Sequence, residues 1–142
     1  MFLEWLRRRR PSMTLGQRGE AAAAKFLKRL RYKIVARGQR DGLGELDLVA
    51  VDLRGERGPT VVFVEVKTRA SHGAGHPADA VDEQKQQKLT RVALSYLRRH
   101  GLLEYPSRFD VIAVTWSDRA KQPTIEHFRD AFEATGDGQM FN

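Results

Sequence analysis

Three charged side chains interrupt two apolar segments in the middle of the sequence, and their types suit a site for a divalent cation. Asp47 lies within the apolar segment 46–51, although aspartate is depleted in strands. Glu65 interrupts a Val- and Phe-rich segment, and Lys67 follows it on the same face of an extended chain. Two carboxylates that converge beside a lysine can hold Mg²⁺, with water and phosphate oxygens as further ligands. The cation would activate a bound water, and the ammonium would orient that water or stabilise charge on the phosphate.

The same three residues also have a purely structural interpretation. Glu65 and Lys67 can form an ordinary ion pair on a solvated strand edge. Asp47 can accept a hydrogen bond from a backbone amide or pair with an arginine. An aspartate followed at some distance by Glu-x-Lys is a loose pattern, so spacing alone leaves both interpretations open.

Hydrophobic periodicity predicts the elements that must position these residues. We expect helices over Met13–Leu30 and Ala80–His100, and strands over Tyr32–Val35, Glu45–Asp52, Thr60–Thr68, Arg108–Trp116 and Thr124–Phe128. Alternation places Leu46 and Leu48 on one face of the second strand and Asp47 on the other, and Glu45 shares the face of Asp47. If the second and third strands pair as a hairpin, Asp47 and Glu65 converge at one end of the sheet. The order predicts an α/β domain with a central mixed sheet flanked by helices, an αβββαβ core.

The composition indicates a globular chain with a positive charge. Its 142 residues include 25 Lys and Arg against 18 Asp and Glu, a formal net charge of +7 at pH 7. This excess favours a polyanionic partner such as nucleic acid. Cysteine is absent, which excludes disulfide scaffolds and thiolate sites and agrees with a cytoplasmic location. No apolar run approaches the roughly 18 residues of a membrane span, so we expect no membrane partner.

Charge and composition also vary along the chain. We expect a basic N-terminal extension over residues 1–13, one domain over 14–133 and a loose C-terminal tail over 134–142. The basic residues between Lys25 and Arg40 can follow a phosphate backbone. Alternatively, they are an ordinary solvated face.

Four motifs, in this order, resemble the YraN-like family of bacterial proteins. They are GQRGEA over 16–21, GELDLV over 44–49, VFVEVKTR over 62–69 and RFDVI over 108–112. The resemblance extends from about Leu15 to Phe132. It implies a fold of the restriction-endonuclease-like type, similar to the PD-(D/E)XK nucleases and to archaeal Holliday-junction resolvases. The chain departs from the family over 37–40, which reads RGQR where the family usually has Arg-Asn-aromatic-Arg.

The resemblance also implies roles for individual residues. Asp47 and Glu65 would bind the metal, Lys67 would assist the water, and Glu20 from the first helix would complete the catalytic set. Lys85 matches a recurrent lysine of the second helix, for which the resemblance implies no role. We predict nucleic-acid contacts from four basic residues, Lys25, Arg40, Arg69 and Lys85.

A second metal site has little support. His72 and His76 are four residues apart, but the glycines and the proline around them exclude a helix that would align them. We predict a plain loop there.

These observations lead to two functional hypotheses. The first is a nucleic-acid-binding, Mg²⁺- or Mn²⁺-dependent endonuclease that hydrolyses phosphodiesters, with DNA favoured over RNA and with branched or damaged DNA as candidate substrates. The alternative is a non-catalytic module that keeps the nuclease fold and binds nucleic acid or recruits a partner. Both are compatible with a homodimer. Fold similarity alone does not establish catalysis.

Overall fold

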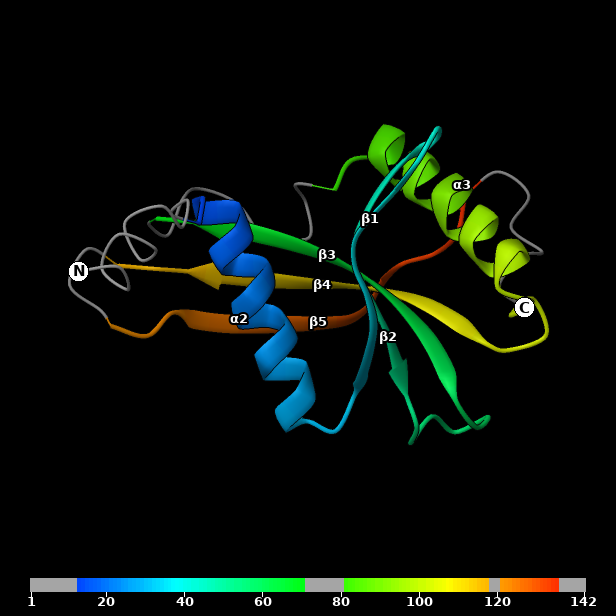
Figure 1. Cartoon of the computed structure of the whole chain (residues 1–142), viewed down its shortest axis with the longest axis horizontal. Coiled ribbons are helices and arrows are strands. Elements are labelled where there is room, and N and C mark those ends of the chain that lie inside the picture. The colour runs from blue at the N-terminus through cyan, green and yellow to red at the C-terminus, as the bar shows by residue number, and fades with distance from the viewer. Residues whose placement is uncertain (1–12, 71–80, 118–120, 136–142) are drawn as a thin grey trace, which may run out of the picture.

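Two helices flank a five-stranded mixed sheet in the computed structural model, which describes residues 13–70, 81–117 and 121–135 (Figure 1). The elements in chain order are α2 (Leu15–Arg29), β1 (Lys33–Asp41), β2 (Gly44–Asp52), β3 (Thr60–Arg69), α3 (Glu83–Arg99), β4 (Ser107–Thr115) and β5 (Thr124–Phe132). The strands lie side by side in sequence order, and all neighbours are antiparallel except β3 and β4. The predicted α/β class and αβββαβ order are therefore confirmed, and β5 adds an edge strand.

The alternation of apolar residues along β3 divides the core between the two faces of the sheet. Phe63 packs with Leu97 of α3 in one apolar cluster. Val62 packs with Leu27 of α2 in another. Both helices are amphipathic and bury their apolar sides. Because Glu65 follows Phe63 by two residues, the alternation directs its side chain toward the face that α3 covers.

Two strands are longer than the sequence predicts. Instead of ending at Val35, β1 continues to Asp41, and β5 continues to Phe132. Glycine is common in turns, yet Gly38 lies within β1 with a positive φ of 53°, which glycine adopts without strain. The actual turn follows at Asp41, whose side chain accepts hydrogen bonds from the next backbone amides, of Leu43 and Gly44.

The predicted faces of β2 are wrong at one position. Leu46 packs with the α3 cluster, whereas Leu48 packs with the α2 cluster. Toward the start of β2, pairing with β3 stops at Leu48 and Val64. The residues of β2 before Leu48 pair only with β1. A two-stranded ribbon twists more strongly than a wide sheet, which explains the change of face. The β1–β2 ribbon then rises alongside α3 (Figure 1).

A buried polar network ties the strands together on the α2 face. The guanidinium of Arg108 donates to Asp110 at 2.9 Å, to Asp52 at 3.0 Å and to the Tyr32 hydroxyl at 2.7 Å. His127 Nε2 lies 2.8 Å from a second oxygen of Asp110. These contacts connect β2, β4, β5 and the chain after α2, and they explain the polar residues of the RFDVI motif structurally.

Several predicted features fall on residues that the structure does not describe. They are His72 and His76, most of the extension over 1–13 and most of the tail over 134–142. Neither helix in the described parts of the chain combines the length and the apolar character that crossing a bilayer requires.

Candidate active site

Asp47 is fixed at the point where β2 separates from β3. Its Oδ2 accepts a hydrogen bond of 2.9 Å from the Val66 backbone N–H, which has no partner on β2 because the ladder ends at Leu48. A half-buried N–H without a partner would be costly. The carboxylate of Asp47 therefore completes the backbone bonding of β3 and lies beside Glu65.

Glu20 reaches the same place from α2. The helix begins at a capping box, in which Thr14 and Gln17 satisfy each other's backbone N–H groups. Next to Glu20, Gly19 packs so closely on β3 that a Cβ there would lie 1.8 Å from the Thr68 hydroxyl. Only glycine permits this approach, which brings the first turns of α2 against the end of β3.

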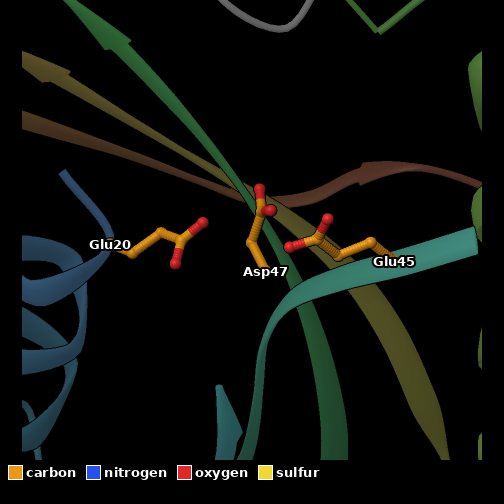
Figure 2. Close-up of side chains that lie close together, drawn as sticks. All are labelled: Glu20, Glu45 and Asp47. Carbon is orange, nitrogen blue, oxygen red and sulfur yellow. The ribbon is translucent and has the colours of Figure 1, made fainter. Parts of the chain in front are cut away.

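Glu45 is a third carboxylate in the cluster, and sequence reasoning did not include it. Carboxylate oxygens of Glu20, Glu45 and Asp47 lie within 4.8 Å of one another. Figure 2 shows Glu20 and Glu45 directing their carboxyl groups toward Asp47 from opposite sides. Arg40 of β1 pairs with Glu45 at 3.1 Å. The signal for Glu45 was its position two residues before Asp47, on the same predicted strand face.

Glu65 and Lys67 lie together, and Lys85 joins them from α3. Glu65 Oε1 is 3.5 Å from Lys67 Nζ and 2.6 Å from Lys85 Nζ. The Glu65 side chain is 7% exposed, so these two ammonium groups balance a nearly buried charge. Lys85, predicted as a nucleic-acid contact, thus lies within the site.

The carboxyl groups perturb one another's protonation. Burial, and then the charge of Glu65, raises the pKa of Asp47 to about 7, although the hydrogen bond from Val66 opposes this. Burial and the charge of Glu45 also raise the pKa of Glu20. Both carboxyl groups therefore hold a proton more readily than in water, first because they are buried and second because other carboxylates lie nearby.

The donor set fits a hard divalent cation. Glu20, Glu45, Asp47 and Glu65 offer only carboxylate oxygens, which suit Mg²⁺ and Mn²⁺. A cation among them would offset both the burial of the Asp47 charge and its repulsion by Glu65, which together raise the pKa of Asp47. Glu45 is exposed, so the cluster is reachable from solvent.

A cleft of about 440 Å³ opens beside the cluster, between the start of β2 and the start of α3. Its lining includes Gly44 and Glu45 on one side and Lys85 and Lys88 on the other. A polyanion in this cleft would meet two lysines next to the carboxylates.

The other predicted nucleic-acid contacts lie on three different elements. Lys25 is exposed on α2, and Arg40 is exposed on β1 beside Glu45. Arg69 is the last residue of β3, two residues after Lys67, and is partly buried. Of the four predicted nucleic-acid contacts, only Arg40 and Lys85 form an ion pair with a carboxylate of the cluster in the described part of the chain.

Comparison with known proteins finds one family along most of the chain. The profile of the uncharacterised protein family UPF0102 matches residues 19–114. A UPF0102 protein of Rhodopirellula baltica is 48% identical over 123 residues, which cover 86% of this chain and 72% of the relative. Another, from Geobacter sulfurreducens, is 49% identical over 119 residues, covering 84% of this chain and 88% of the relative. These matches confirm the resemblance to the YraN-like family.

Among solved structures, a chain of an EndoMS–dsDNA2 complex is similar with a TM-score of 0.38 and 15% identity. The similarity covers 71% of this chain and 38% of that chain.

Proposed function

This chain belongs to the uncharacterised protein family UPF0102, and from its own site we propose that the protein is a divalent-metal-dependent DNA endonuclease. The observation that supports this most directly is the convergence of Glu20, Glu45, Asp47 and Glu65 with Lys67 at one end of the sheet. Stability alone would not favour such crowding of carboxylates, one of which has its pKa raised to about 7.

Mg²⁺ or Mn²⁺ is the proposed cofactor, and Asp47 and Glu65 are its proposed protein ligands. Glu20 and Glu45 are close enough to Asp47 to share in holding it or its waters. Bound there, the cation would supply an activated water and neutralise charge on the scissile phosphate.

The protein groups have separate tasks in this proposal. The Val66 N–H fixes the direction of the Asp47 carboxylate. Lys67 Nζ lies within 3.5 Å of Glu65, where it can donate to the attacking water or to a phosphate oxygen. Lys25, Arg40 and Arg69 are proposed to bind the nucleic-acid backbone, in keeping with the net charge of +7.

The direct test is a cleavage assay on linear, single-stranded, flapped and four-way DNA with Mg²⁺ and with Mn²⁺. We expect Lys67→Ala to lower the cleavage rate by about 10²–10³ while DNA affinity changes little, because a preorganised donor acts mainly on the transition state. The matched variant Lys25→Ala should do the reverse, weakening affinity while leaving the rate at saturating protein unchanged.

Two outcomes would contradict the proposal. A wild type that binds DNA but cleaves no member of the panel supports the non-catalytic module instead. If the wild type cleaves DNA and Lys67→Ala cleaves it at the same rate, the active site lies elsewhere.

A further inference from the structure

The backbone of Lys85 is fixed at the start of α3. Asp82 caps the helix, and its side chain accepts a hydrogen bond of 2.8 Å from the Lys85 N–H. Val81 just before the cap is 2% exposed, so the core anchors the chain there. The long side chain of Lys85 therefore moves from a fixed base.

The Lys85 ammonium lies on the solvent side of the Glu65 carboxylate. Its Nζ is 2.6 Å from Glu65 Oε1, and the Lys85 side chain is 42% exposed against 7% for Glu65. Although burial lowers the pKa of Lys85, the bond to Glu65 raises it overall, so the ammonium stays charged. A cation that approaches Glu65 from the solvent meets this positive charge first.

The same lysine also lines the cleft beside the site, with Lys88 and Glu45. A lysine side chain has several rotatable bonds, and its three N–H donors can serve a phosphate oxygen as readily as a carboxylate. The side chain that holds Glu65 therefore also borders the cleft, where a phosphate oxygen would offer its ammonium a second partner.

We propose that Lys85 exchanges partners during the function proposed above. It binds the Glu65 carboxylate when no divalent cation is there, and it turns into the cleft to bind a phosphate oxygen of the nucleic acid when a cation binds Glu65. This inference rests on the proposed function. Metal and nucleic acid would then favour each other's binding, because the metal displaces Lys85 from Glu65 and a phosphate of the nucleic acid binds the displaced ammonium.

The first test measures Mn²⁺ binding by calorimetry without nucleic acid. Lys85→Gln should bind Mn²⁺ about three- to tenfold more tightly than wild type, because it removes a partly exposed competing ion pair. Lys85→Arg, which keeps the charge, should stay within about twofold of wild type. Arg91→Gln is the control, because it removes an exposed charge of the same helix that is not part of this ion pair. Its Mn²⁺ affinity should also stay within about twofold of wild type.

The second test measures the coupling on a DNA duplex. Ca²⁺ should raise the DNA affinity of wild type several-fold more than it raises that of Lys85→Gln. In the unsubstituted protein, Mg²⁺ should also shift the side-chain NMR signals of Lys85. That measurement does not depend on the folding of any variant.

The outcomes separate the two proposals. If wild type binds Mn²⁺ but Lys85→Gln binds it equally or more weakly, Lys85 is only a support for Glu65 and this inference fails alone. Lys85 signals that do not change at saturating Mg²⁺ overturn it as well. If wild type binds no divalent cation at all, both this inference and the metal-dependent function fail.

Discussion

The substitution Asp47→Asn should make the metal-free protein more stable at neutral pH. Asparagine keeps an oxygen that can accept the Val66 N–H, but it removes the charge that burial and Glu65 disfavour. The folded-state pKa of Asp47 is about 7 against 3.8 for the unfolded chain. At about 1.36 kcal/mol for each pKa unit, this difference corresponds to about 4 kcal/mol as an upper limit.

The observable gain should be smaller than that limit. A neutral amide accepts a weaker hydrogen bond than a carboxylate, which costs about 1 kcal/mol, and the carboxylates share the repulsion. We therefore expect a gain of about 1–3 kcal/mol, or about 3–10 °C in Tm for a domain of this size.

The sign of the pH dependence follows from the direction of the shift. Between about pH 4 and pH 7 the folded state holds a proton on Asp47 that the unfolded chain has released. Stability of the wild type therefore falls as pH rises through this window. The advantage of Asp47→Asn should be absent below pH 4 and complete above pH 7.

Differential scanning calorimetry with a chelator, at pH 3.5 and pH 8, measures this difference. Asp47→Ala is the control, because it removes the charge but leaves the Val66 N–H unpaired, and it should be less stable than Asp47→Asn. Addition of Mg²⁺ should raise the Tm of wild type and leave that of Asp47→Asn nearly unchanged. An Asp47→Asn protein that is no more stable than wild type at pH 8 would refute the reasoning.

Three further predictions concern the scaffold and the partner. Arg108→Met removes the guanidinium shared by two buried aspartates, leaving Asp52 only the exposed Arg129 and Asp110 only His127, and should cost about 3–5 kcal/mol in urea unfolding; a loss below about 1 kcal/mol would contradict it. Gly19→Ala places a Cβ against Thr68 and should cost about 1–3 kcal/mol by the same measurement, whereas Gly16→Ala, where space is available, should not destabilise. DNA affinity measured by fluorescence anisotropy should fall linearly on a log–log plot against salt, and Lys25→Ala should reduce the slope by about 1; a slope near zero would exclude phosphate-dominated binding.

The strand residues of the site could be predicted because they break a local pattern. Asp47 and Glu65 are acidic in segments that are otherwise apolar. Glu20 could be found only through the family resemblance, because a glutamate on an amphipathic helix is ordinary. Glu45 was missed for a related reason, since an acidic residue between a turn and a strand reads as solvent-exposed.

What the sequence could not predict depends on contacts between distant residues. Gly38 is a residue type that is common in turns, and its place within a strand is explained only by the pairing of β1 with β2. The change of face between Leu46 and Leu48 depends on where β2 leaves β3. The pairing of Lys85 with Glu65 joins α3 to β3, and no local periodicity encodes it.

The residue type at position 47 is informative about the role of the site. Where β2 leaves β3, the Val66 N–H needs an acceptor, and an asparagine could provide one without charge. The chain instead has an aspartate whose burial beside Glu65 raises its pKa to about 7 and lowers the stability of the free protein. Local choices that reduce stability are expected where function requires them. The structural interpretation of Asp47 as a simple backbone acceptor therefore explains its hydrogen bond but not its charge, and the charge is what a divalent cation would use.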